Sequence, residues 1–249
     1  MHFPQLARDV IDVIYPGRCA ACSADCDGHA FLCHSCSAGL DHLASQPACE
    51  RCAAPVVSNG APCPWCRDRG IYPFKKIVRL GRFGDPLRPL IHAMKYHRRW
   101  PLAKLLAERM AQEKRIADLL QNTDALLPVP LHWVRHITRG YNQSDLLATA
   151  LAKRFDLKII RPVRRIRRTP SQTGISSRTV REENVRGAFA VKKKTDGVAG
   201  KRIVVIDDVM TTAATLHAVA RLLVPMHPAG ISALVVALTD PKNQDFQAI

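Results

Sequence analysis

The sequence lacks the long apolar segments and the leader by which membrane and secreted proteins are recognised. No apolar run reaches the roughly 18 residues that a membrane-spanning helix needs. The chain begins Met1-His2-Phe3-Pro4, without a basic segment followed by an apolar core, which argues against a secretory signal. Residues 3–14 instead suggest one short amphipathic helix, which we expect to pack onto its own domain rather than to contact a membrane surface.

Several catalytic motifs are also missing. The chain contains no Gly-x-x-x-x-Gly-Lys-Ser/Thr, so it carries no P-loop motor. It also has no Gly-x-Gly-x-x-Gly, His-Glu-x-x-His or Gly-x-Ser-x-Gly, which leaves dinucleotide-binding, zinc-protease and serine-hydrolase chemistry without support.

Acidic residues are scarce relative to basic ones. The 249 residues include 37 Lys and Arg but only 21 Asp and Glu, which gives a net charge of +16. Such a balance favours nucleic acid, an anionic membrane surface or phosphorylated ligands as partners, although a soluble protein can be basic without any of them. The length suits one large domain or two smaller ones.

Cysteine is absent after residue 66 and concentrated before it. Eight of the nine cysteines form four Cys-x-x-Cys pairs: Cys19/Cys22, Cys33/Cys36, Cys49/Cys52 and Cys63/Cys66. Two such pairs complete a tetrahedral Cys₄ site, so the four pairs predict two structural Zn²⁺ ions. Disulfides are disfavoured without a secretory signal, and a redox Cys-x-x-Cys would normally occur once.

The spacing of the pairs repeats. Ten residues separate Cys22 from Cys33, and ten separate Cys52 from Cys63, which predicts two similar zinc ribbons in tandem, with interleaved pairing as the alternative. We expect Cys26 to be an ordinary thiol, and eight cysteines satisfy two ions without the nearby histidines, His29 and His34. Because the segment has few large apolar side chains, metal binding would supply its folding free energy.

Beyond residue 70 the pattern alternates between strands and helices. We expect strands at 74–82, 124–130, 202–206 and 230–238, and helices at 85–97, 101–120, 142–155 and 213–224. This alternation predicts an α/β domain with a parallel or mostly parallel sheet flanked by helices. We therefore expect an N-terminal helix with a double zinc ribbon in residues 1–70 and the α/β domain in residues 71–249.

Two adjacent carboxylates follow the strongest strand. Ile203 to Ile206 are β-branched, and Asp207 and Asp208 come directly after them. Ligands of open α/β sheets bind beyond the carboxyl ends of the strands, where paired carboxylates can accept hydrogen bonds from two sugar hydroxyls. The hydroxyl-rich turn and the free N–H groups of the next helix suit a phosphate. A sugar phosphate is therefore the expected ligand, whereas a helix-capping Asp would explain only one of the two acids.

The segment resembles the phosphoribosyl-diphosphate binding motif of type I phosphoribosyltransferases. The resemblance implies that Asp207 and Asp208 are the catalytic pair that holds the ribose 2′- and 3′-hydroxyls. It also implies a loop for the 5′-phosphate, formed by Thr211, Thr212, Ala213, Ala214 and Thr215. Ala213 departs from the motif, because glycine is usual there. A methyl group would crowd the phosphate or cost about 1 kcal/mol if φ is positive, so we expect weakened or altered binding rather than loss of the site.

A cationic segment follows the strand that ends at Pro128-Val129-Pro130. Arginines at a strand terminus can hold a pyrophosphate through charge-assisted hydrogen bonds, and glycine permits close backbone approach. The segment closely resembles a signature of the ComF family of competence-associated proteins, which joins a zinc module to a phosphoribosyltransferase-like domain. The residues expected to bind substrate there are Arg135, Arg139, Gly140, Asn142 and Gln143, and Tyr141 is the aromatic of the signature. The alternative is a surface loop that begins a helix.

A second ComF-like signature runs from Arg167 to Phe189. In phosphoribosyltransferases the matching region is a flexible loop that closes over the reacting centre and excludes water. The resemblance assigns Arg168, Gln172, Thr173 and Arg178 to this loop. A solvated basic connector or a nucleic-acid surface would contain the same residue types, so these interpretations stay open.

Basic residues and aromatics also occur together. Between Arg161 and Arg202 there are thirteen basic residues against three acidic ones, enough to neutralise several backbone phosphates. The run Lys95-Tyr96-His97-Arg98-Arg99-Trp100 places aromatics beside cations, a mixture that suits single-stranded DNA. We expect Trp100 itself to be partly core and so to serve in packing rather than as a stacking platform.

The cysteines and the three signatures together identify the chain as similar to ComF-family proteins along most of its length. The resemblance implies a cytoplasmic bacterial protein that acts in natural competence or in the use of imported DNA. Expected partners are phosphoribosyl diphosphate with Mg²⁺, single-stranded DNA and other competence proteins. Two hypotheses remain: a phosphoribosyltransferase whose acceptor is unknown, and a non-catalytic DNA-binding protein whose sugar-phosphate pocket senses a ligand.

Overall fold

The computed structural model of the protein describes residues 17–26, 31–67, 70–168, 185–193, 195 and 197–239. The N-terminal helix expected at 3–14 lies outside these residues. Within them, no helix is both long enough and apolar enough to cross a membrane.

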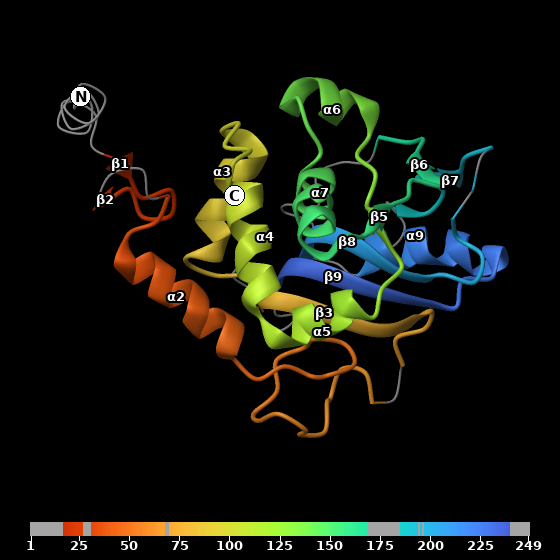
Figure 1. The fold of residues 1–249 in the computed structure, drawn as a ribbon, viewed down its shortest axis with the longest axis horizontal. Coiled ribbons are helices and arrows are strands. Elements are labelled where there is room, and N and C mark those ends of the chain that lie inside the picture. Colours follow the sequence, from red (N-terminus) through yellow and green to blue (C-terminus); the bar gives the residue numbers. More distant parts are fainter. Residues whose placement is uncertain are drawn as a thin grey trace.

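A five-stranded sheet forms the centre of the molecule (Figure 1). Its strands, in spatial order, are β3 (Phe74–Arg82), β9 (Gly230–Leu238), β8 (Arg202–Met210), β4 (Ala125–Pro128) and β5 (Lys158–Ile159). Every neighbouring pair in this sheet is parallel, so all five strands end at one edge, here called the C-terminal edge. The predicted α/β class with a parallel sheet is confirmed.

Side chains alternate between two hydrophobic clusters along the central strand β8. Val204 and Ile206 belong to one cluster, and Ile203 and Val205 belong to the other. Because successive side chains of a strand point to opposite faces, the two clusters are the cores on the two faces of the sheet. β-branched residues fill this strand because both of its faces are buried.

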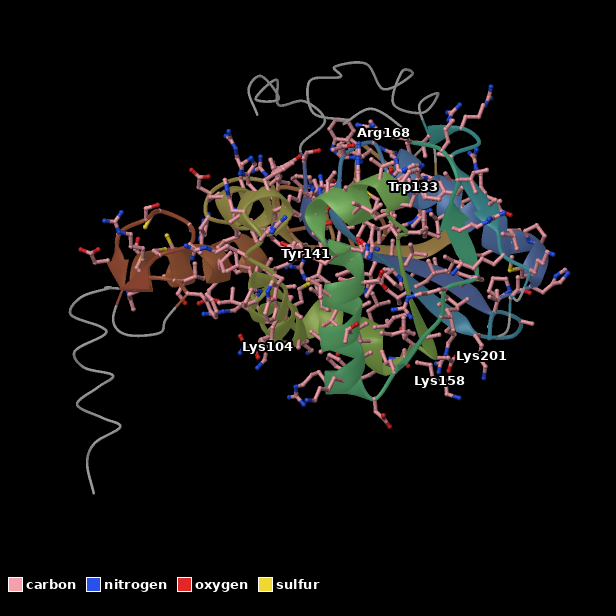
Figure 2. All side chains as sticks on the ribbon, turned by 90° about the horizontal axis from the view of Figure 1, so that it is seen from above. Lys104, Trp133, Tyr141, Lys158, Arg168 and Lys201 are labelled. Carbon is pink, nitrogen blue, oxygen red and sulfur yellow. The ribbon has the colours of Figure 1, made fainter. Side chains whose placement is uncertain are left out.

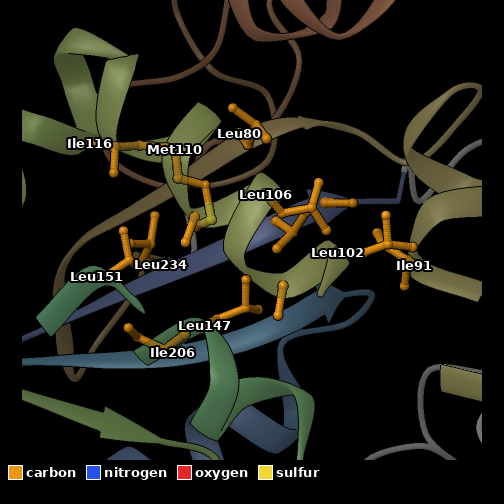
Figure 3. Close-up of a cluster of buried hydrophobic side chains, with 14 of the residues drawn as sticks. Leu80, Ile91, Leu102, Leu106, Met110, Ile116, Leu147, Leu151, Ile206 and Leu234 are labelled. Atoms are coloured by element: carbon orange, nitrogen blue, oxygen red, sulfur yellow. The ribbon is translucent and has the colours of Figure 1, made fainter. Parts of the chain in front are cut away.

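Helices cover the two faces of the sheet unequally. The first face is covered by α3 (Leu87–Tyr96), α4 (Leu102–Gln112), α5 (Lys114–Gln121) and α7 (Gln143–Phe155). Figure 3 shows Leu106, Met110 and Leu147 of this layer facing Ile206 and Leu234 of the sheet. The second face is covered by α9 (Ala214–Leu223), followed by the 3₁₀ turn Val224–Met226, and by a two-stranded hairpin of β6 (Val163–Arg165) and β7 (Phe189–Val191).

Three expectations about individual elements differ from the structure. The helix expected at 101–120 is two helices, because Glu113 adopts an extended backbone between α4 and α5. β8 does not end at Ile206 but continues through Asp207 and Asp208 to Met210. The chain also forms elements that were not expected, namely α6 (Trp133–Arg139), β5 and the β6–β7 hairpin.

The zinc module contains a short hairpin of β1 (Gly17–Arg18) and β2 (Asp25–Cys26) and the helix α2 (His34–Ser45). Its first half contributes Cys19 and Leu32, and α2 contributes Leu40, to the core of the first face. Its second half contributes Cys52 and Cys63 to the core of the second face. The module therefore extends around the β3 edge of the sheet, with α2 between its two halves (Figure 1).

Backbone and side-chain bonds tie this module to β3. The Ile77 N–H donates to the Arg51 carbonyl at 2.8 Å, and the buried Arg79 donates to the Pro47 carbonyl at 3.4 Å. An uncovered edge strand presents unpaired backbone groups and invites pairing with other chains. The module thus protects the β3 edge while it packs against both cores.

Candidate functional site

The eight paired cysteines gather into two groups of four, in sequential order. The first group is Cys19, Cys22, Cys33 and Cys36, and the second is Cys49, Cys52, Cys63 and Cys66; in each group the sulfurs all lie within 4.8 Å of one another. Tetrahedral zinc with Zn–S bonds of about 2.3 Å places its sulfurs about 3.8 Å apart. The Sγ–Sγ distances of 3.7 Å for Cys22–Cys33 and 3.5 Å for Cys52–Cys63 fit that geometry.

The environment of the thiols favours a bound cation. Burial raises the pKa of Cys66 to about 11 and raises that of Cys52 as well, whereas burial of Cys63 is outweighed by backbone hydrogen bonds, which lower its pKa. A bound cation would favour the thiolate forms of all of them. Cys26 is in neither group, and its sulfur points to the Ala24 carbonyl at 3.8 Å. His34 is also in neither group, and His29 lies outside the described residues.

The acidic pair lies at the C-terminal end of β8, where Asp208 is buried and Asp207 is partly buried. Asp207 Oδ1 accepts from the Ser144 hydroxyl at 3.0 Å and from the Asp208 N–H at 2.9 Å. Asp208 Oδ2 lies 3.0 Å from Lys95 Nζ. Burial and the charge of Asp208 raise the pKa of Asp207 to about 7, while Lys95 acts in the opposite direction. The two carboxylates are thus held side by side by a hydroxyl, an N–H and an ammonium.

The turn after β8 has the backbone expected of a phosphate loop. Ala213 is left-handed, with φ of 60° and ψ of 6°, and α9 begins at the next residue, Ala214. Thr212 Oγ1 is buried, and it has no hydrogen-bond partner among the described residues. The chain therefore presents a hydroxyl and the N-terminal N–H groups of a ten-residue helix at this turn, a donor set that suits a phosphate.

The signature Arg139-Gly140-Tyr141-Asn142-Gln143 connects α6 to α7. Gly140 ends α6 with a φ of 83°, a conformation that glycine adopts without strain. Asn142 caps α7 by accepting from the Ser144 N–H, and its amide donates to the Val129 carbonyl at 2.9 Å. Gln143 is 2% exposed, and Arg139 donates to its Oε1 at 3.4 Å. The predicted residues of this segment therefore lie next to the acidic pair, joined to it through Ser144.

Further cations converge on the same edge. The pKa of Arg165 is lowered to about 10 by burial and then by the charge of Arg135, while Asp207 opposes the shift. Burial, followed by the charge of Arg139, lowers the pKa of Arg135, and burial followed by Arg165 lowers that of His132. Buried cations that lie close enough to lower a neighbour's pKa favour an anionic ligand.

The described part of the expected flexible loop is small. Arg168 is exposed, and Figure 2 shows it on the same side of the molecule as Trp133 of α6. Gln172, Thr173 and Arg178 lie outside the described residues. Their role in a closing loop stays a prediction.

Aromatic side chains are more exposed near this edge than the sequence indicates. Trp100 is 60% exposed, so the expectation that it serves mainly in packing is wrong. Trp133 is 65% exposed and Tyr96 is 48% exposed. Such side chains beside arginines are available for stacking.

The sequence did not predict three residues that lie near the acidic pair: Lys95, Ser144 and Arg165. Ser144 directly follows the signature Arg139–Gln143, so its position in the sequence could have identified it as a site residue. Lys95 contacts Asp208 from α3, and Arg165 on the β6–β7 hairpin interacts electrostatically with Asp207. Both depend on tertiary packing between distant segments, which no local sequence pattern indicates.

Comparisons with known proteins agree with this arrangement. Residues 10–67 match the double zinc ribbon domain family, and residues 142–246 match the phosphoribosyl transferase domain family. The DNA utilization protein YhgH of Escherichia coli (strain K12) is 33% identical over 216 residues, which cover 84% of this chain and 91% of that protein. Competence protein F of Haemophilus influenzae is 31% identical over 193 residues, which cover 76% of this chain and 83% of that protein.

Among solved structures, an orotate phosphoribosyltransferase from Aeropyrum pernix aligns with 19% identity and a TM-score of 0.34, covering 61% of this chain and 64% of that one. The assignment rests on the sequence matches, which include a relative above 30% identity that is matched along most of its length. The chain belongs to the ComF family, in which a double zinc ribbon precedes a phosphoribosyltransferase-like domain.

Proposed function

We propose that this protein binds phosphoribosyl diphosphate at the C-terminal edge of its sheet and acts in the use of imported DNA in the cytoplasm. One observation carries the proposal: the acidic pair, the left-handed turn before α9 and the Arg139 signature all meet at that edge. The acids can accept hydrogen bonds from a diol, the turn can donate to a phosphate, and the arginines can bind a pyrophosphate. The relatives named for competence and DNA utilization support the biological context.

Each part of the ligand has its own group of residues. Asp207 and Asp208 accept hydrogen bonds from the ribose 2′- and 3′-hydroxyls. The turn that holds the 5′-phosphate consists of Thr211, Thr212, Ala213, Ala214 and Thr215. The pyrophosphate lies toward Arg135, Arg139, Gly140, Asn142 and Gln143. Mg²⁺, which would arrive with the pyrophosphate, supplies charge neutralisation of the leaving group.

Catalysis, if the protein transfers the phosphoribosyl group, would rest on electrostatics. The C1′–O bond to pyrophosphate breaks with its electron pair on the departing oxygen, positive charge builds at C1′, and an acceptor then forms the new bond. Fixed arginines stabilise the departing anion without reorganising, and such electrostatic stabilisation contributes more to catalysis than any other effect in many enzymes. Closure of the loop that contains Arg168, Gln172, Thr173 and Arg178 would exclude water from C1′.

Each Cys₄ group holds one Zn²⁺ in this proposal. All four ligands of each group come from the protein, so no position remains for a water molecule. The zinc ions are therefore structural.

Calorimetry with phosphoribosyl diphosphate and Mg²⁺ tests the proposal. The wild type should bind, and the double variant Asp207→Ala/Asp208→Ala should lose at least about tenfold in affinity, because two charge-assisted hydrogen-bond acceptors are removed. Asp118→Ala, an exposed acid on α5, is the matched control and should bind normally. The proposal fails if the folded wild type shows no binding heat with Mg²⁺ present.

Single-stranded DNA binding is the second candidate, and the exposed Trp133 and Trp100 beside arginines favour it. Bases stack on such side chains, and arginines neutralise backbone phosphates. The acidic double variant should retain DNA affinity, whereas Trp133→Ala should weaken it by about tenfold. An affinity that does not change between low and physiological salt would rule this surface out.

A further inference from the structure

Three consecutive residues at the C-terminal end of α3 contact two parts of the proposed ligand site, the acidic pair and the Arg139 signature. The Met94 carbonyl accepts from the Tyr141 hydroxyl at 2.5 Å. Lys95 Nζ lies 3.0 Å from Asp208. The Tyr96 ring lies under the Arg139 guanidinium, with 5.1 Å between the guanidinium carbon and the ring centroid.

The Lys95–Asp208 pair is largely removed from water. The Lys95 side chain is 21% exposed and that of Asp208 is 11% exposed. Two neighbouring carboxylates at a buried strand end repel each other, and the Lys95 ammonium is placed to offset that repulsion. Removing one member of such a pair leaves the other charge poorly compensated, unlike the loss of a surface ion pair.

Tyr96 is held on two sides. His92, one turn earlier on α3, lies 4.7 Å from it between ring centroids, and Arg139 lies over its face. A guanidinium over an aromatic ring gains cation–π energy and loses rotamer freedom. The stack therefore favours the direction in which Arg139 extends over the Tyr96 ring.

The rest of α3 is anchored in the core. Leu87, Leu90, Ile91 and Met94 are at most 2% exposed, so the last turn is held on a rigid element. Yet α3 lies outside residues 142–246, the range that matches the phosphoribosyl transferase domain family. The contacts at residues 94–96 thus come from a part of the chain that the family match does not include.

We propose that the last turn of α3 completes the ligand site, with Lys95 as the positioning residue for the acidic pair and Tyr96 as the positioning residue for Arg139. The Lys95 ammonium, 3.0 Å from Asp208, offsets the repulsion between the two carboxylates that a vicinal diol would contact. Tyr96 keeps Arg139 directed at the pyrophosphate. This inference rests on the proposed function for the identity of the ligand, but the role of Lys95 can be measured without any ligand.

Lys95→Met is the test variant, because it removes the charge and keeps the length of the side chain. Lys104→Met on α4 is the matched control, since Lys104 is 79% exposed and pairs only with Glu108 on its own helix among the ion pairs of the described residues. Lys95→Arg is the conservative variant, which keeps the positive charge and should keep the wild-type Asp207 midpoint and ligand affinity. Thermal unfolding checks that each variant is folded.

The first measurement is a ¹³C NMR titration of the Asp207 and Asp208 carboxyl carbons in the ligand-free protein. The groups that face Asp207 are Asp208, Lys95, Ser144 and Arg165. In Lys95→Met the Asp207 midpoint should move to higher pH by about one unit, because the ammonium that favours the ionised form is gone. Lys95→Arg and Lys104→Met should keep the wild-type midpoint. An unchanged midpoint in folded Lys95→Met overturns the role of Lys95.

The second measurement is calorimetry of phosphoribosyl diphosphate and Mg²⁺ across pH. Lys95→Met should lose about fivefold in affinity at pH 7 and regain it at higher pH, as a midpoint shifted by about one unit requires. Tyr96→Leu should weaken binding at every pH, whereas Tyr96→Phe, which keeps the ring, should not. A loss in Lys95→Met that is the same at every pH contradicts the positioning role. If the wild type does not bind at all, the proposed function fails, and the NMR titration still decides the role of Lys95.

Discussion

Ala213 has the backbone of a glycine. Its φ of 60° is left-handed, at the position where the phosphoribosyl-diphosphate motif usually has glycine. For an L-residue this conformation costs about 1–2 kcal/mol, because Cβ approaches the following carbonyl oxygen. The turn therefore keeps its geometry at the expense of stability. A strained residue that persists at a ligand-binding turn is consistent with a functional constraint.

Replacing Ala213 by glycine should stabilise the protein. Relief of left-handed strain outweighs the larger backbone entropy that glycine loses on folding, with a net gain of about 0.5–1 kcal/mol. The affinity for phosphoribosyl diphosphate should also rise, because the methyl group no longer approaches the phosphate. Urea unfolding and calorimetry measure the two effects. A less stable Ala213→Gly protein would show that the turn is not strained.

Asp207 should make both stability and binding depend on pH. Its folded pKa of about 7 lies above the ordinary value, so the folded state binds more protons than the unfolded state between about pH 4 and pH 7. The free energy of unfolding contributed by this group therefore falls as pH rises through that window. Asp207→Asn can still accept a hydrogen bond from Ser144 but does not titrate. In thermal unfolding measured across this pH range, the variant should lose the part of the pH dependence of stability that Asp207 contributes.

Binding should respond to pH in the opposite direction. A ribose diol needs an ionised carboxylate as acceptor, so the affinity for phosphoribosyl diphosphate should increase as pH rises through about 7. Calorimetry at pH 6 and pH 8 would show it. A constant affinity over this range would mean that Asp207 is already ionised at pH 6.

At the scale of elements, sequence periodicity predicted the buried parallel strands well. β8 and β9 are continuous apolar runs because both faces of the sheet are covered, and such runs are visible in the sequence. The break at Glu113 was missed because Leu106, Met110, Ile116 and Leu120 continue an apolar pattern across it. The β6–β7 hairpin was missed because its strands have three residues each and are far apart in the chain.

The candidate site was predictable only where its residues are local in sequence. Asp207, Asp208 and the turn to Thr215 form one continuous motif, and Arg139 to Gln143 form another. Lys95 and Arg165 reach the site through tertiary packing, and no spacing in the sequence reports such an approach. The family resemblance supplied the pairing of the two motifs, which the shared edge of the sheet explains physically.

The two Cys₄ groups should contribute unequally to stability. The second group includes buried Cys52, Cys63 and Cys66 within the core of one sheet face, whereas Cys22 of the first group is exposed. Cys63→Ser should cost about 3 kcal/mol or more, a fall in Tm of about 6–12 °C for a chain of this size. Cys22→Ser should cost less, although each variant loses one zinc equivalent by metal analysis. An equal fall in Tm would contradict the difference in packing.

At the scale of the whole molecule, the zinc module is part of the structure of the sheet. It covers the β3 edge through the Arg51 carbonyl and supplies side chains to both cores. The sequence suggested a division between residues 1–70 and 71–249, and composition does change there. Composition cannot report that the two parts share hydrophobic clusters, which arises only from tertiary packing.

A fragment of residues 71–249 should therefore be less stable and less soluble than the full chain. Without the module, β3 becomes an open edge strand, and apolar surface is exposed on both faces. We expect lower solubility and a lower Tm than for the full chain, measured by light scattering and calorimetric unfolding. A monomeric fragment with the full-chain Tm would show that residues 71–249 fold without the zinc module.

The site at the end of β8 can be tested most directly by a crystal structure of the full chain with phosphoribosyl diphosphate and Mg²⁺. We predict that the ribose hydroxyls lie within hydrogen-bond distance of Asp207 and Asp208, with the 5′-phosphate on the turn at Ala213. Ligand bound elsewhere, with both acids still engaged only by Lys95 and Ser144, would contradict the proposed sugar-phosphate site.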